Sequence, residues 1–197
     1  MNKSTSTFQL AQSKQFIIAA LLMFIMILTR GNITAHIQDA SWAIFFLVGF
    51  YLRSSSLSRY AFPFFFLLAF VIDLIVIDAQ GGTHYCFTAS YPFLIPSYAA
   101  MWFAGRLFAG KYQENMSGLV NFIGLAFIGV VVCFLVSNLG FYYFAGKFEA
   151  MSLMQYSQSV AKYLPAYLST TGIYLGFFAL LHLSIVHGRK LQNHVHS

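Results

Sequence analysis

Six apolar stretches, separated by short polar connections, dominate the hydrophobic pattern of the chain. An α-helix rises about 1.5 Å per residue and a bilayer core is about 30 Å thick, so about 20 apolar residues can cross a membrane. The pattern therefore predicts an all-α integral membrane protein, a compact bundle of six transmembrane helices in a single domain over residues 1–197. The expected helices cover residues 15–33, 40–52, 60–79, 90–109, 118–145 and 163–187.

Two of these stretches are unusual. The stretch at 40–52 would form a helix only about 20 Å long, so crossing would require a thinned bilayer or flanking residues. The stretch that follows Lys3 and Lys14 has the outline of a signal peptide, but no small-residue cleavage site comes after it. We interpret it as a retained first helix.

The positions of lysine and arginine predict the orientation, because cytoplasmic connections carry an excess of both. If the N-terminus lies in the cytoplasm, only Arg30, Lys147 and Lys162 face outward. Both termini are then cytoplasmic, as an even number of crossings requires. The other basic residues face the cytoplasm, namely Lys3, Lys14, Arg53, Arg59, Arg106, Lys111, Arg189 and Lys190.

The outer connections then carry most of the chemically versatile side chains. These connections are residues 31–39, 80–89 and 146–162. The third combines adaptable methionines with hydrogen-bonding groups, which is typical of a lid. We therefore expect the outer end to be the functional end, with the candidate groups His36, Asp39, Asp78, His84, Cys86, Glu149 and Gln155.

Composition agrees with a membrane protein and argues against nucleic-acid binding. The chain is 59% hydrophobic and 8% charged, whereas soluble domains carry about 25% charged residues. The net charge of +6 comes from 11 lysines and arginines that are scattered without a basic run. We therefore expect the lipid bilayer, and not nucleic acid, as a partner.

Asp73 lies inside the apolar run 61–77. A carboxylate in the membrane is costly unless it is paired or hydrated, so such residues usually have a function. The alternative is a protonated aspartate that hydrogen-bonds a neighbouring helix and only stabilises the bundle.

The segment 80–92 combines two glycines, an imidazole, a thiol and two phenols. The thiol of Cys86, close in sequence to His84, could be a soft metal ligand, a redox centre or a nucleophile. The alternative is a small, inert, half-buried cysteine. The sequence lacks the ligand spacing of a structural zinc site. The second cysteine, Cys133, has only apolar neighbours and is predicted to pack in a helix interface.

With these residues identified, the chain resembles the substrate-binding S-components of energy-coupling-factor vitamin importers, six-helix membrane proteins of about this length. Within that group it is most similar to the solitary cobalamin-specific S-components, the BtuM family. In that family a membrane aspartate is followed thirteen residues later by a cysteine and five residues after that by a tyrosine. Asp73, Cys86 and Tyr91 reproduce this spacing, and His36 matches a histidine expected after the first helix.

The resemblance implies a transporter of the bacterial inner membrane, not an enzyme, that takes up cobalamin from the outer side and has no cofactor of its own. It also implies that Cys86 ligates the cobalt ion and that bound cyanocobalamin can lose its cyanide. Cobalt accepts thiolate and imidazole ligands, aromatic rings suit a flat corrin, and the peripheral amides need partners such as Ser90 and Gln155. The predicted cobalamin-binding residues are Cys86, His36, Asp73, Tyr91, Tyr85, Phe87, Thr83 and His84.

One feature departs from the family pattern. S-components that dock a shared energy-coupling module usually carry an AxxxAxxxA face on the first helix, which permits close helix approach. Here Ala19 and Ala20 are followed by Leu21 and Leu22, and the face is absent. We therefore expect the protein to act without a dedicated energy-coupling module.

Two other classes of function stay open from the residues alone. One is a membrane enzyme that uses Cys86 as a redox or nucleophilic thiol, with Asp73 as a proton relay. The other is a non-catalytic scaffold subunit in which Asp73 pairs with a partner helix.

Overall fold

The computed structural model describes residues 12–31, 38–54, 58–79 and 88–195, and within these ranges the side chains of residues 13–188. All regular elements in these ranges are helices, as the hydrophobic pattern predicted. They are α1 (Gln12–Arg30), α2 (Ser41–Tyr51), α3 (Ser58–Ala79), the 3-10 turn η1 (Tyr91–Phe93), α4 (Leu94–Lys111), α5 (Met116–Phe144), α6 (Leu153–Ala161) and α7 (Leu164–Val195).

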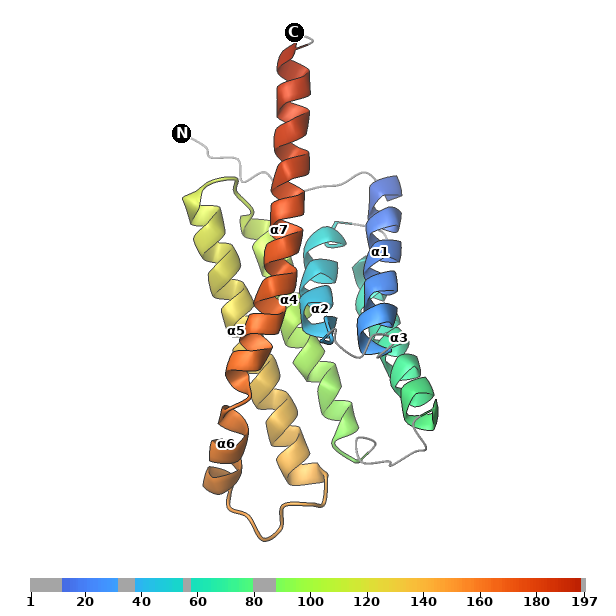
Figure 1. The fold of residues 1–197 in the computed structure, drawn as a ribbon, viewed down its shortest axis with the longest axis vertical. Helices are drawn as coiled ribbons and strands as arrows, with labels where there is room; N and C mark the ends of the chain where they lie inside the picture. Colours follow the sequence, from blue (N-terminus) through green and yellow to red (C-terminus); the bar gives the residue numbers. More distant parts are fainter. Residues whose placement is uncertain (1–11, 32–37, 55–57, 80–87, 196–197) are drawn as a thin grey trace.

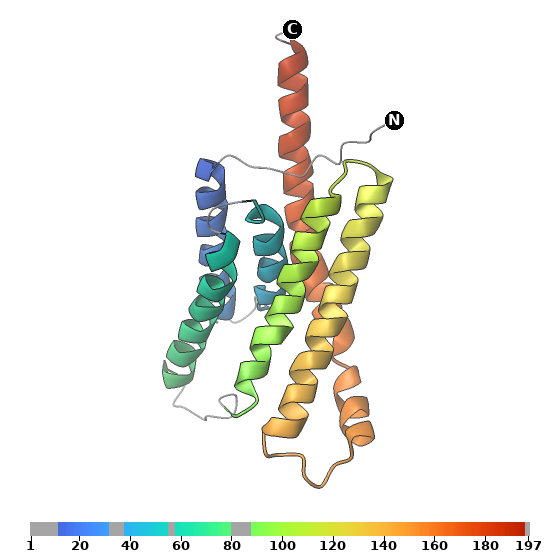
Figure 2. The ribbon, with the colours of Figure 1, turned by 180° about the vertical axis from the view of Figure 1, so that it is seen from behind.

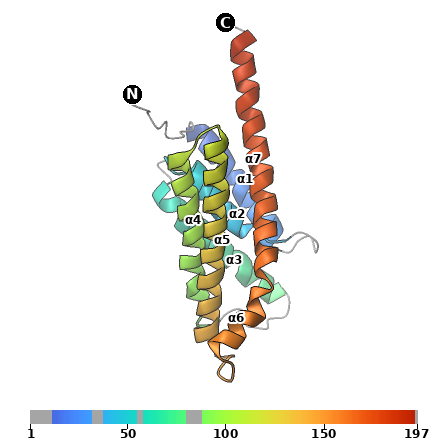
Figure 3. The same cartoon turned by 90° about the vertical axis from the view of Figure 1, so that its left-hand side faces the viewer.

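The helices form one bundle whose two ends differ (Figure 1). The start of α1 and the end of α7 lie at the same end, and α7 continues well past the other helices there (Figures 1 and 3). The opposite end carries α6 and the start of α4, and the view from behind shows α4 and α5 side by side (Figure 2). We call the end with α6 the outer end and the other the inner end.

Each of the six expected stretches coincides with a helix. Four helices are long and apolar enough to cross a membrane, namely Ser13–Arg30, Ser58–Ala79, Met116–Phe144 and Leu164–Gly188. Many of their large apolar side chains are exposed, for example Ile17 (69%) and Leu180 (69%). Such surfaces suit contact with lipid, so the fold indicates a multi-pass membrane protein.

The short helix α2 lies at the centre of the bundle. Nearly all of its residues are buried, including Phe45 and Phe46. An enclosed helix contacts other helices in place of lipid, so its length need not match the bilayer thickness. This enclosure explains the short apolar stretch without a thinned membrane.

Two glycines bring α2 and α4 into direct backbone contact. A Cβ atom at Gly49 would collide with the carbonyl oxygen of Trp102, and a Cβ atom at Gly105 would collide with the carbonyl oxygen of Phe46. Small residues permit such close helix approach in membranes. The contact fixes the relative position of α2 and α4 along the whole bundle.

Candidate functional site

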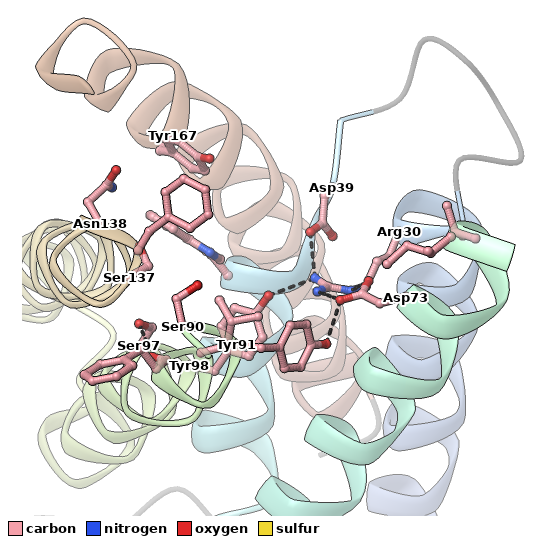
Figure 4. Close-up of a pocket in the computed structure, with 16 residues that line it drawn as sticks. Arg30, Asp39, Asp73, Ser90, Tyr91, Ser97, Tyr98, Ser137, Asn138 and Tyr167 are labelled. Carbon is pink, nitrogen blue, oxygen red and sulfur yellow. Dashed lines mark hydrogen bonds and ion pairs between the residues drawn. The ribbon is translucent and has the colours of Figure 1, made fainter. Parts of the chain in front are cut away.

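A cavity of about 580 Å³ opens near the outer end, with walls from α1, α3, α4, α5 and α7 and from residues around the start of α2. Figure 4 shows its lining side chains. Among them the polar residues are Arg30, Asp39, Asp73, Ser90, Tyr91, Ser97, Tyr98, Ser137, Asn138 and Tyr167.

Arg30, the last residue of α1, organises one wall of this cavity. Its Nε and Nη2 atoms donate to the two carboxylate oxygens of Asp73, each at 2.7 Å. This bidentate geometry is the strongest arrangement available to a guanidinium–carboxylate pair. The pair joins the end of α1 to α3, the apolar helix that contains Asp73.

The remaining nitrogen of Arg30, Nη1, reaches α2 and α4. It donates to Asp39 Oδ2 at 3.0 Å, to Ser41 Oγ at 3.0 Å and to the hydroxyl of Tyr98 at 2.9 Å. The other carboxylate oxygen of Asp39 accepts from the backbone N–H of Ser41 at the start of α2. One guanidinium group therefore connects the outer ends of four helices.

Asp73 also accepts a hydrogen bond from the hydroxyl of Tyr91, with 2.7 Å between Oδ2 and the phenol oxygen (Figure 4). The side chain of Asp73 is 20% exposed and that of Arg30 is 9% exposed. Three hydrogen-bond donors, two from Arg30 and one from Tyr91, therefore point at one carboxylate. Asp73 is thus paired, as its position in an apolar helix requires.

Tyr91 lies in η1, just before α4. Burial, and then its hydrogen bond to Asp73, raise the pKa of the Tyr91 phenol well above its ordinary range. The phenol is therefore protonated near neutral pH and can donate to Asp73. Its hydrogen bond to Asp73 connects the Arg30–Asp73 pair to the turn that precedes α4.

Aromatic side chains form the other wall. Trp42 and Tyr167 stack with ring centroids 4.5 Å apart and an angle of 18° between their planes. Both also border a neighbouring cavity of about 430 Å³ that includes Asp39. Flat apolar surface beside charged and hydroxyl groups is the usual composition of a small-molecule site.

The outer segment 146–162 adds a helix that the hydrophobic pattern did not predict. Ser152 and Gln155 form a reciprocal capping box at the start of α6. Tyr156, only 3% exposed, donates to Asn138 Oδ1 at 3.2 Å. Because Asn138 lines the cavity, α6 contacts the outside of the cavity wall.

Among the predicted site residues, Asp73 and Tyr91 line the cavity and hydrogen-bond each other, and Ser90 lines it as well. Gln155, expected to bind a ligand amide, closes the capping box of α6 with its side-chain oxygen. The other predictions lie outside the described residues, namely His36, Thr83, His84, Tyr85, Cys86 and Phe87. In the described part of the chain, no group of three or more His, Cys, Asp or Glu side chains could hold a metal ion.

No protein-family model matches the chain, and no curated protein matches it. The similarity to cobalamin-specific S-components therefore rests on the spacing of His36, Asp73, Cys86 and Tyr91.

Sequence reasoning missed Arg30 and Tyr98 as site residues. A signal for Arg30 was present, because the predicted first helix, 15–33, contains this cation, just as the third contains Asp73. Opposite charges inside two apolar helices of one bundle are expected to pair. Tyr98 had no such signal, since a tyrosine near a helix end is usual in membrane proteins.

Proposed function

We propose that the protein is a membrane transporter that binds cobalamin at its outer, periplasmic end and mediates its uptake across the bacterial inner membrane. In this proposal six helices cross the membrane, both termini are cytoplasmic, and no dedicated energy-coupling module is required. The main support is that Asp73 and Tyr91, two residues of the cobalamin-specific spacing, hydrogen-bond each other in the wall of the outer cavity.

The size and chemistry of the outer end suit a bulky ligand with a flat apolar face and polar edges. Two neighbouring cavities of about 580 and 430 Å³ share Asp39, Trp42 and Tyr167. The stacked Trp42 and Tyr167 offer apolar surface for the corrin ring. The hydroxyl oxygens of Ser90 and Ser137, which also line the cavity, can accept hydrogen bonds from peripheral amides.

Cys86 is the proposed cobalt ligand. It lies four residues before Ser90 and five residues before Tyr91 in the sequence, and both of these line the cavity. Cobalt binds soft thiolate ligands, and a coordinating thiol is deprotonated on the metal. With cyanocobalamin, the thiolate would replace cyanide by ligand exchange at an unchanged cobalt oxidation state, and the thiol proton would leave with the cyanide as hydrogen cyanide.

The network around Asp73 has a positioning role in this proposal. Arg30 donates to both oxygens of the Asp73 carboxylate, and Asp73 accepts a hydrogen bond from the Tyr91 hydroxyl. Tyr91 follows the Cys86 segment and starts the turn that leads into α4. A fixed Tyr91 therefore anchors one end of the segment that carries the cobalt ligand.

The corrin absorption spectrum tests the proposal, because it responds to a change of axial cobalt ligand. Purified protein mixed with cobalamin should shift this spectrum, and Cys86→Ala should abolish the shift. Cys133→Ala is the matched control, since the chain has two cysteines and Cys133 is buried in α5 and does not line the cavity. An unchanged shift in Cys86→Ala would disprove thiolate ligation.

If cobalamin binds without any role for Cys86, the proposed substrate is retained but another group must ligate the cobalt. If neither added nor cell-derived corrinoid binds to the purified protein, the transporter proposal is wrong. Inactivation of some other activity by thiol reagents, without dependence on corrinoid, would then support the thiol-enzyme alternative.

A further inference from the structure

Two arginines, Arg53 and Arg106, connect helices at the inner end of the bundle. Arg53, which follows α2, donates from Nη1 to the backbone carbonyl oxygen of Arg106 in α4 at 2.8 Å. Arg106 donates from Nη1 to the hydroxyl of Ser58, the first residue of α3, at 2.5 Å. The Arg53 guanidinium therefore contacts the backbone of α4, and the Arg106 guanidinium contacts the start of α3.

Close backbone packing fixes this arrangement. The guanidinium group of Arg53 lies over Gly110, where an added Cβ atom would collide with it. The backbone contacts at Gly49 and at Gly105 bring α2 and α4 close enough for Arg53 to reach the backbone of α4. Both arginine side chains are partly buried, unlike flexible surface cations.

Acidic residues do not neutralise these two charges. The chain has five acidic residues, and the only one near the inner end is Glu114. Within the part of the chain that the structure describes, the ion pairs join Arg30 to Asp39 and to Asp73 at the outer end. Two partly buried cations on neighbouring helices, without an acidic partner among the described residues, favour the binding of an anion.

The surroundings of Arg106 indicate which kind of anion fits. Its guanidinium carbon lies 4.8 Å from the centre of the Trp102 ring, and tryptophan is enriched at the level of lipid headgroups. Phe103 and Leu107, on the same helix, are each 55% exposed. A charged site therefore adjoins a lipid-facing apolar surface.

We propose that Arg53, Arg106 and Ser58 bind the phosphate of an anionic phospholipid of the inner leaflet, whose acyl chain lies along Phe103 and Leu107. Guanidinium groups bind phosphate oxygens in a bidentate manner, and anionic lipids are enriched in the cytoplasmic leaflet. The lipid would hold together the inner ends of α2, α3 and α4. The outer ends of the same helices contribute Ser41, Asp73 and Tyr98 to the cavity network.

Tryptophan fluorescence provides a direct test, because the chain has two tryptophans, Trp42 and Trp102. In a Trp42→Phe background the emission comes from Trp102 alone. This protein is placed in nanodiscs of phosphatidylcholine that contain a small fraction of phosphatidylglycerol brominated near the glycerol end of its chains. Bromine quenches nearby tryptophan, so the brominated anionic lipid should quench Trp102 more strongly than the same fraction of brominated phosphatidylcholine.

The preference for the anionic lipid should fall by roughly fivefold for each arginine replaced by glutamine, in Arg53→Gln and in Arg106→Gln. Arg59→Gln is the matched control, since Arg59 is exposed at the same end and has no contact with Trp102 among the described ring contacts. If the glutamine variants lose their helical circular dichroism, Arg53→Lys with Arg106→Lys replaces them. These lysines keep the charge but lose the planar fork, so the preference should fall by less than in the glutamine variants.

Equal quenching by the two brominated lipids would overturn the proposal, and so would a preference that survives replacement of both arginines. Inorganic phosphate added to detergent-solubilised protein separates a soluble anion from a lipid. If phosphate alone changes Trp102 emission through Arg53 and Arg106, the site takes soluble phosphate and the lipid proposal is wrong. No corrinoid is present, so these outcomes are independent of the proposed transport function.

Discussion

The arginines at the outer and inner ends of the bundle have different kinds of partners. At the outer end Arg30 is bound by two carboxylates and by two hydroxyls, those of Ser41 and Tyr98. At the inner end Arg53 bonds the backbone of another arginine, Arg106. Charge at the outer end is therefore neutralised by the protein itself and can fix the geometry of a site. At the inner end, Arg53 and Arg106 have no acidic partner among the described ion pairs, which is why we propose a lipid phosphate as their counterion.

The largest expected effect comes from breaking the outer pair. Arg30→Met removes all donors from the Asp73 carboxylate except the Tyr91 hydroxyl and should destabilise the protein by about 3–5 kcal/mol, since it leaves a partly buried charge unpaired. Arg106→Met removes one of two like charges and should cost less than about 1 kcal/mol. Thermal unfolding of both variants in the same detergent measures the difference.

The double variant Arg30→Met with Asp73→Asn distinguishes charge from packing. Removing both charges should recover part of the lost stability, because no unpaired charge remains. Equal stability of Arg30→Met and Arg106→Met would contradict the contrast between the two ends.

The contact between α2 and α4 links the two ends, and its disruption should affect both. Gly105→Ala places a methyl group against the carbonyl oxygen of Phe46, so we expect a loss of about 1–3 kcal/mol from overpacking. Gly176→Ala is the control, because nothing lies within 4 Å of its added Cβ atom. That variant should be neutral, or more stable by up to about 1 kcal/mol. If Gly105→Ala is as stable as Gly176→Ala in thermal unfolding, the described helix contact is wrong.

Much of the helical architecture follows from the sequence, but the pairing of side chains does not. The lengths of the hydrophobic runs predicted all six main helices. They did not predict α6, because its nine residues lie in a polar connection. Arg30 and Asp73 were both visible as charges in apolar runs. Their bond joins residues 43 positions apart and depends on α1 packing beside α3, which no local pattern encodes. The inner arginine pair likewise depends on how closely Gly49 and Gly105 bring α2 and α4 together.

A smaller effect is expected from the last bond of the outer network. Tyr91→Phe removes the hydroxyl that donates to Asp73 and should cost about 1–2 kcal/mol of stability. If Tyr91 anchors the segment of Cys86, cobalamin affinity should also fall. Tyr143→Phe is the matched control, since Tyr143 belongs to the same end and is 62% exposed. If the two variants bind cobalamin equally well, Tyr91 does not belong to the proposed site. If they are equally stable to heat, the bond from Tyr91 to Asp73 does not contribute to stability.

The smallest expected effect is that of pH, between about 7 and 9, on the stability contributed by the Tyr91 hydroxyl. The pKa of Tyr91 is raised in the folded protein by burial and by its bond to Asp73. A raised pKa means that the stabilisation is fully present below the unfolded-state pKa of about 10 and is lost only as the pH rises through the higher folded-state value. The stability difference between the wild type and Tyr91→Phe should therefore stay constant from about pH 7 to about pH 9. Above about pH 10 the difference should shrink in thermal unfolding, and a difference that stays constant there would mean that burial and the bond to Asp73 do not raise the pKa of Tyr91.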